Sequence, residues 1–241
     1  MRKNIVKAKT KAGERVFGVS FTYPDLQALE IMGNLGFDFI FIEGEHGSFS
    51  LRDIEEMCIA ANALGMTVHA RVPNIHSSTI LGFLDRGVQG VLGPHIRTKA
   101  DAEALAAACR FAPQGKRSFY GSRLADSTFP EDVPAYMAEA NREMWVCALL
   151  EDREAVEENL QDILAVEGLD AVSIGFVDLS QSMGHPGDWK HPEVAGAMEN
   201  AWKQIAGAGK SAVRDLINMA RLTEFLISGG KEYLAKGKAA K

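Results

Sequence analysis

Two carboxylates and an imidazole directly follow an apolar run near the start of the chain. In FIFIEGEHGSF, Glu43, Glu45 and His46 come at the end of four residues suited to a buried strand. Charged groups are costly to bury, so a strand that ends in three titratable side chains marks a candidate site. His46 can act as a general base near neutral pH, and Glu43, three residues earlier, could hold its tautomer.

Later strand-like runs also end in polar residues, among them His95 in GPHI. Glu151 and Asp178 are separated by about one helical crossover, so their carboxylates should converge. Such a pair either shares a proton or holds a cation, and an all-oxygen pair suits Mg²⁺ or Mn²⁺. The alternative is that each caps the helix that follows it. Glu43 and His46 could hold the metal instead, but they supply fewer carboxylate oxygens than Glu151 and Asp178.

Arg71, in HARVP, ends the third apolar run. Its guanidinium could bind a carboxylate or a developing oxyanion, or it could pair with Glu43 or Glu45. A hard cation, a base and an arginine around one opening suit deprotonation beside a carbonyl with stabilisation of the enolate, as in aldol chemistry.

The elements that must position these residues alternate between strands and helices. Alternation of this kind predicts a parallel sheet. The expected strands are 16–23, 37–43, 67–72, 90–96, 145–151, 169–176 and, more weakly, 211–217 and 231–237. An open doubly wound sheet and a closed (β/α)8 (TIM) barrel both fit. The barrel is favoured, because it gathers the carboxyl ends of its strands at one mouth and because no phosphate-binding glycine motif follows any strand.

Composition bounds the remaining possibilities. The chain has 241 residues, of which 46% are hydrophobic and 24% charged, a globular balance whose length allows one large α/β domain or two small ones. No linker interrupts the alternation of strands and helices, so we expect one domain over 1–241. The net charge of −6 argues against nucleic-acid binding. Three widely spaced cysteines predict a reducing compartment, and no apolar stretch predicts a signal peptide or membrane span. We therefore expect a cytoplasmic protein with no membrane partner.

Several stretches together resemble one enzyme family. They are FDFIFIEGEHG, HARVP, FLDRGVQGVLGPHI, ACRFAPQGKRS, VEGLDAVSIGFVDLSQSMG and HPEV, and they cover most of residues 15–210. The chain is similar to the class II pyruvate aldolases of the HpcH/HpaI family, which includes 4-hydroxy-2-oxoheptanedioate aldolase and 2-dehydro-3-deoxyglucarate aldolase. The resemblance implies a (β/α)8 barrel that reversibly cleaves a 4-hydroxy-2-oxo acid into pyruvate and an aldehyde. It also implies a metal-bound enolate, held on Mg²⁺, Mn²⁺ or Co²⁺.

The resemblance also implies roles for individual residues. Glu151 and Asp178 match the metal ligands, His46 the base that works through a metal-bound water, and Arg71 the group that steadies the enolate. The main chain of Gly175, Phe176 and Val177 matches the loop that holds the pyruvate carboxylate. Asp85 matches an acid that is linked to the site, and Ser122 matches a residue that contacts the aldehyde half of the substrate. From the residues alone, Asp85 is a charge partner at a helix end.

The chain departs from the family pattern in places. Relatives usually carry aspartate at the position of Glu43, and some carry glutamine at that of Leu149. Phe176 and Val177 replace the usual proline and alanine. The C-terminal strand and helix are expected to be atypical or truncated, which weakens the trimer or hexamer that the resemblance implies. Two other functions fit the same residues. One is an oxaloacetate-type β-oxo acid decarboxylase, and the other is an inactive barrel that binds small acids.

Overall fold

One parallel sheet organises the protein. The computed structural model describes residues 2–120 and 130–239. Every neighbouring pair of strands is parallel, in the order β6-β5-β4-β3-β2-β1-β7. The strands are β1 (Val16–Phe21), β2 (Phe39–Glu43), β3 (Thr67–Arg71), β4 (Gly90–Gly93), β5 (Trp145–Leu150), β6 (Ala171–Ile174) and β7 (Ile217–Arg221). The first six lie within the predicted ranges.

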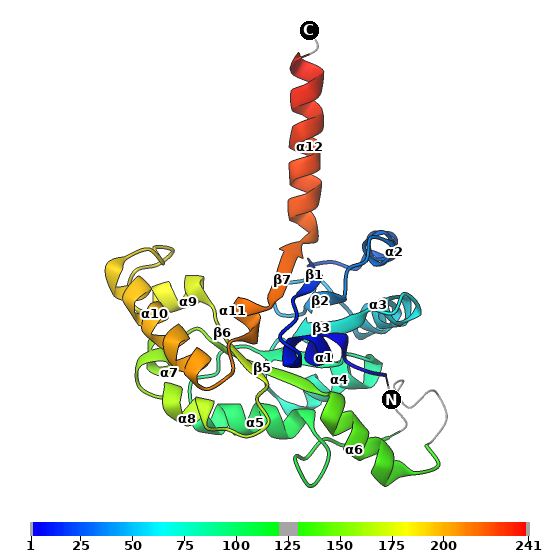
Figure 1. Cartoon of the computed structure of the whole chain (residues 1–241), viewed down its shortest axis with the longest axis vertical. Coiled ribbons are helices and arrows are strands. Elements are labelled where there is room, and N and C mark those ends of the chain that lie inside the picture. The colour runs from blue at the N-terminus through cyan, green and yellow to red at the C-terminus, as the bar shows by residue number, and fades with distance from the viewer. Residues whose placement is uncertain (1, 121–129, 240–241) are drawn as a thin grey trace.

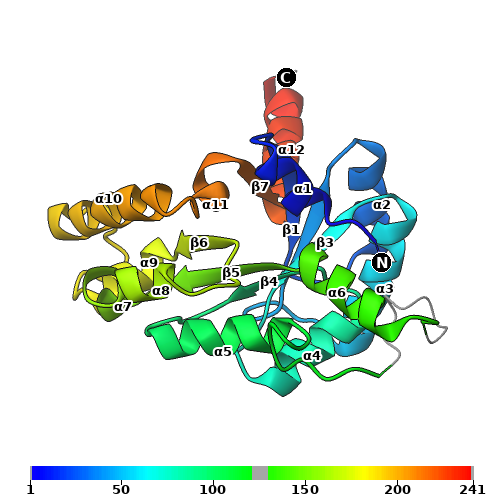
Figure 2. The same cartoon turned by 60° about the horizontal axis from the view of Figure 1, so that its bottom comes forward.

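Helices connect the strands and pack around the sheet (Figure 2). Their starts follow local capping chemistry: Asp25 caps α2, and Ser50 and Thr98 each form a capping box with an aspartate three residues later. The helices are α1 (Ile5–Lys11), α2 (Leu26–Asn34), α3 (Leu51–Ala63), α4 (Ser77–Arg86), α5 (Lys99–Cys109), α6 (Val133–Glu143), α7 (Arg153–Glu157), α8 (Leu160–Leu164), α9 (Phe176–Ser182), α10 (Pro192–Gly207), α11 (Ala212–Asp215) and α12 (Leu222–Ala239).

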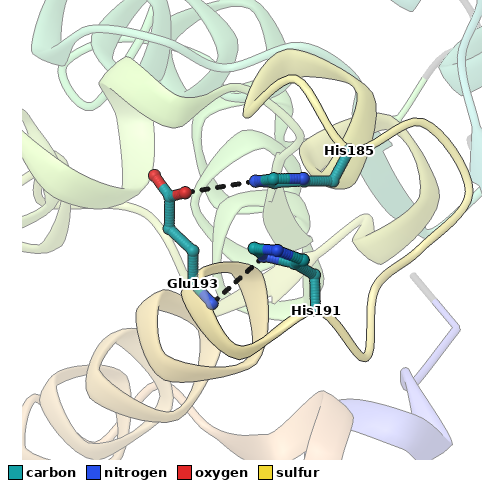
Figure 3. Close-up of side chains that lie close together, drawn as sticks. All are labelled: His185, His191 and Glu193. Carbon is teal, nitrogen blue, oxygen red and sulfur yellow. Dashed lines mark hydrogen bonds and ion pairs between the residues drawn. The ribbon is translucent and has the colours of Figure 1, made fainter.

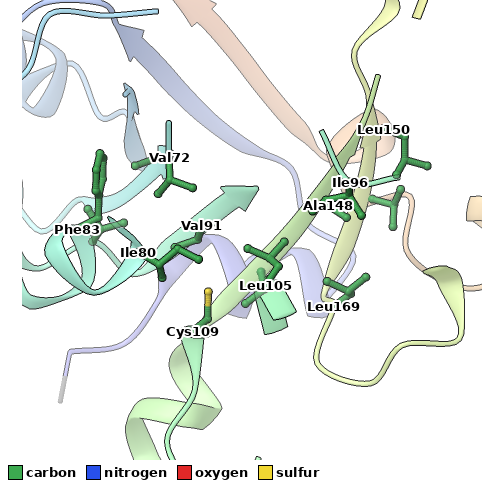
Figure 4. Packing of buried hydrophobic residues seen from close by; sticks show 14 of the residues in the cluster. Val72, Ile80, Phe83, Val91, Ile96, Leu105, Cys109, Ala148, Leu150 and Leu169 are labelled. Carbon is green, nitrogen blue, oxygen red and sulfur yellow. The ribbon is translucent and has the colours of Figure 1, made fainter. Parts of the chain in front are cut away.

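The two faces of the sheet are buried in different ways. Alternate residues such as Ile40, Val68 and Ala148 face the helices and join the main apolar core, part of which is drawn in Figure 4. The intervening residues face inward, where Phe39 and Phe41 pack with Val6 of α1. Because both faces are covered, the strands are nearly continuous in apolar residues, as parallel sheets require.

The sheet does not close into the predicted eight-stranded barrel within the described residues. β7 pairs with β1, which leaves β6 and β7 as the two edges. The prediction of a strand at 211–217 was wrong over most of its length: the main chain at Lys210 accepts one hydrogen bond from Val172, and the chain then turns into α11. Residues 217–221 supply the strand instead.

The predicted final strand at 231–237 was also wrong. These residues belong to α12, an 18-residue helix that projects away from the rest of the chain (Figure 1). Lysine, glutamate, leucine and alanine favour a helix, and Glu232 pairs with Lys236 one turn later at 2.6 Å. Among the described helices, none is long and apolar enough to cross a membrane.

Candidate active site

A pocket of ≈ 490 Å³ lies at the carboxyl ends of the strands. Glu43, Arg71 and Glu151 line it from β2, β3 and the end of β5. His46 lines it from the loop after β2, and Gly175, Phe176, Val177 and Asp178 line it from the start of α9. Residues far apart in sequence therefore meet here because each follows a strand of one parallel sheet.

Glu43 and Arg71 form the most extensive ion pair of the pocket. They face each other in the register of β2 and β3, and the Arg71 Nε donates to both carboxylate oxygens of Glu43 at 2.8 and 2.9 Å. The same carboxylate accepts the main-chain N–H groups of Glu45 and His46 at 3.0 and 3.2 Å. Glu43 thus shapes the turn that carries His46 through its main chain, while the His46 ring stays 68% exposed.

Arg71 contacts three carboxylates at once. Its Nη1 lies 3.0 Å from Glu45 Oε2 and 3.9 Å from Glu151 Oε1. Burial by itself lowers the pKa of Arg71, but hydrogen bonding and charge from Glu43, with the charges of Glu45 and Glu151, raise the pKa above its usual value. Arg71 therefore remains a cation, and its side chain is only 16% exposed.

Glu45, predicted as a possible partner of Arg71, belongs to this cluster, and so does His95, which was assigned no role from the sequence. His95 lies between two carboxylates, with Nε2 3.4 Å from Glu45 and Nδ1 3.4 Å from Glu151. Its main-chain N–H donates to Glu151 Oε2 at 3.1 Å, and its φ is +52°, a left-handed conformation uncommon outside glycine. The sequence placed both residues at strand ends, and that position was the available signal.

Glu151 is the most deeply buried carboxylate of the pocket, at 3% exposure. Burial raises its pKa, and the nearby charge of Glu45 adds to the rise, while the His95 N–H and the positive charges of His95 and Arg71 oppose it. Binding of a further cation would stabilise the charged form of this buried carboxylate. Asp178 lines the same pocket and supplies a second oxygen donor, so the residues present fit a hard divalent ion.

Gly175 makes room for Glu151. A Cβ at this position would lie 2.6 Å from Glu151 Oε1, closer than real Cβ contacts allow. The Gly175 N–H donates to the Leu150 carbonyl at 2.9 Å, so this amide is already used. The amides of Phe176 and Val177 lie in the first turn of α9, where helical N–H groups have no intrahelical partner. Of the three amides assigned from the resemblance, these two are available to a ligand.

Three further positions named in the sequence analysis are Asp85, Leu149 and Ser122. Asp85 is not among the residues that line the pocket. It accepts a hydrogen bond from Arg117 Nη2 at 3.1 Å, the helix-end charge pairing predicted from the residues alone. Leu149 lines the pocket as an apolar wall. Ser122 lies outside the described residues.

Comparison with known proteins gives the family of the chain. Residues 23–237 match the HpcH/HpaI aldolase/citrate lyase family. The chain belongs to this family. A hydroxypyruvate/pyruvate aldolase of Deinococcus radiodurans is 37% identical over 234 residues, which cover 97% of this chain and 83% of the relative. A 4-hydroxy-2-oxo-heptane-1,7-dioate aldolase of Salmonella dublin is 34% identical over 227 residues, covering 94% and 86%.

A solved structure of a family protein from Burkholderia cenocepacia superposes with a TM-score of 0.85 at 26% identity, covering 98% of this chain and 100% of that one. Family membership confirms the enzyme class predicted from the sequence, an aldolase-type lyase. Aldolases of this family are typically dependent on a divalent metal and act on small 2-oxo acids and aldehydes.

Proposed function

We propose that this HpcH/HpaI-family protein reversibly cleaves a 4-hydroxy-2-oxo acid into pyruvate and an aldehyde, with Mg²⁺, Mn²⁺ or Co²⁺ held by Glu151 and Asp178. The observation that carries the proposal is one pocket in which these two carboxylates lie with Arg71 and His46. A divalent ion bound there would polarise the 2-oxo group as a Lewis acid.

The other residues have roles that follow from their contacts. Arg71 is held on one side by Glu43, and its Nη1 is near Glu45, so its guanidinium is pre-oriented toward charge that develops in the pocket. The amides of Phe176 and Val177 are available to hold the substrate carboxylate. The exposed ring of His46 is positioned to move the proton of the 4-hydroxyl group, through an intervening water.

The direct test is pyruvate release from 4-hydroxy-2-oxo acids of different chain length, with and without EDTA. We expect activity that EDTA abolishes and that added Mn²⁺, Mg²⁺ or Co²⁺ restores. Oxaloacetate, assayed in parallel, separates cleavage of a carbon–carbon bond to an aldehyde from decarboxylation. Cleavage that persists in EDTA would contradict the metal role. Titration that detects pyruvate binding, without turnover of any substrate tested, would contradict the aldolase role.

We also propose that residues 1–241 form one domain derived from a (β/α)8 barrel. The support is the direct pairing of β7 with β1, the pairing expected of an eighth strand, while segment 210–216 touches β6 through one backbone hydrogen bond. A single cooperative unfolding transition is expected, and two separate transitions would contradict it.

A homo-oligomer, a trimer or hexamer, is proposed as well. The support is α12, on which Leu226, Ile227 and Leu234 are each more than half exposed. Light scattering at micromolar concentration is expected to give three or six copies, and a monomer would contradict the proposal.

A cytoplasmic location is proposed because all three cysteines are buried as thiols.

A further inference from the structure

A second group of metal-ligating side chains lies outside the pocket. His185 and His191 stack ring on ring, with centroids 3.5 Å apart and planes 17° apart, next to the carboxylate of Glu193 (Figure 3). His185 Nε2 lies 3.1 Å from Glu193 Oε2. One ligand atom from each of the three residues lies within 4.8 Å of the other two. None of them lines the pocket that holds Glu151 and Asp178.

From this arrangement we propose that His185, His191 and Glu193 bind a borderline transition-metal ion of the Zn²⁺ class. Two imidazoles and one carboxylate select Zn²⁺, Ni²⁺ or Cu²⁺ over the hard ions that suit an all-oxygen set. Zinc bonds of about 2.0–2.2 Å place tetrahedral ligands roughly 3.4 Å apart. The three donors lie within 4.8 Å of one another, so their side chains must rotate, and the two stacked rings must tilt apart, for their nitrogens to meet one ion, and water then completes the coordination.

The backbone already holds the ligands in place. In the loop between α9 and α10, the His185 N–H donates to the Ser180 carbonyl at 2.8 Å, and the His191 N–H donates to Asp188 at 3.1 Å. Glu193 is fixed in the first turn of α10, where its N–H donates to His191 Nδ1 at 3.4 Å. Ligands ordered before binding lose little entropy when an ion arrives.

Arg153 provides the outer contact that metal-binding carboxylates need. Its Nη2 lies 3.2 Å from Glu193 Oε1 and leaves Oε2 facing His185. Partners of this kind orient the ligand that touches the metal. A bound ion would fasten the loop between α9 and α10 to the start of α10. That loop also carries Trp189, whose ring packs against Phe176 at 5.1 Å, so the ion lies one contact from the pocket.

The test is calorimetric titration of the tag-free Glu151→Gln/Asp178→Asn protein with ZnCl₂, because this background lacks the two carboxylates of the pocket. We expect one equivalent of Zn²⁺ to bind. His185→Asn and His191→Asn should each weaken binding by more than about 100-fold, and Arg153→Gln by about 10–100-fold. Asparagine at 191 keeps an N-cap acceptor for α10. Ni²⁺ or Cu²⁺ should also quench the fluorescence of Trp189, and Trp189→Phe identifies that signal.

The matched control is His76→Gln, which removes an exposed histidine elsewhere on the surface. It should leave Zn²⁺ affinity and stoichiometry unchanged. Thermal melting without metal should be alike for all variants, which separates a lost ligand from a lost fold. Absence of Zn²⁺ binding in the background protein would overturn the proposal. Equal affinity in the His185 and His191 variants would overturn it too, as would an equal loss in the His76 control.

Discussion

The inward-facing residues of the sheet differ sharply between its two ends. At the carboxyl end, Glu43, Arg71 and Glu151 form a charged network around the pocket. Toward the amino end of the same strands, His69 stacks on Trp145 at 4.7 Å and lies 5.8 Å from Phe39. Both ends are buried, so the contrast is between groups that are paired for chemistry and groups that are packed for stability.

His69 shows how far the environment differs. It is fully buried, and desolvation lowers its pKa from 6.5 to about 3, so it stays neutral. At the other end burial raises the pKa of Glu151, which is surrounded by charged partners. The comparison teaches that this fold separates function from stability along the length of each strand, as parallel barrels do.

The strongest test of the comparison is Glu151→Gln. We expect a loss of at least about 1000-fold in kcat/KM, because the amide removes an anionic oxygen donor of the pocket. Stability should not fall at pH 7. A carboxyl whose folded pKa is raised contributes stability below its unfolded pKa and loses it as pH rises through the folded pKa, so Glu151 contributes less near neutral pH than in acid and the uncharged amide loses little there. Glu199→Gln, at an exposed side chain of α10, should change neither quantity. An active Glu151→Gln enzyme would contradict the assignment.

Arg71→Lys is expected to have the next largest effect. Lysine keeps the charge but cannot bind Glu43 through one side of a planar fork while it offers the other side to the pocket. A loss of about 100-fold in kcat/KM is expected, measured under the conditions used for Glu151→Gln. Arg52→Lys, at a side chain that is 86% exposed, is the control and should be silent. Activity near that of the unmodified protein would show that charge alone suffices.

Gly175→Ala should reduce activity by about 10–100-fold, because its Cβ would displace the Glu151 carboxylate. The control is Gly196→Ala. Gly196 lies within α10, and a Cβ there meets nothing within 4 Å. That change should leave activity intact and stabilise the protein by about 0.5–1 kcal/mol, since glycine is unfavourable inside a helix. Equal effects of the two substitutions would mean that space beside Glu151 does not matter.

The final prediction lies at the opposite end of the strands and concerns the pH dependence of stability. Because the folded pKa of His69 is about 3 and its unfolded value is 6.5, its contribution is fully present above pH 6.5. As pH falls from 6.5 toward 3, this contribution is lost at up to about 1.4 kcal/mol per pH unit. Chemical denaturation between pH 7 and 4 measures the slope. His69→Gln should flatten it, and an unchanged slope in that variant would contradict the prediction.

Several features could be predicted from local sequence. Six strands and the alternation of strands with helices followed from the apolar runs, because these depend on neighbours close in the chain. The grouping of Glu43, Arg71, Glu151 and Asp178 at one edge followed from their position at strand ends. Parallel topology carries that position into space.

The tail of the sheet and the finer contacts needed the tertiary structure. Residues 211–217 and 231–237 are ambiguous by pattern, and pairing of 217–221 with β1 is a long-range choice. The positive φ of His95 and its place between Glu45 and Glu151 depend on two other strands. The meeting of His185, His191 and Glu193 depends on how one loop folds back on α10. The sequence alone determined that polar residues follow the second to the sixth strands, because local polarity marks those positions. Only the folded chain decided which of them touch, because contact between side chains depends on distances that no local pattern encodes.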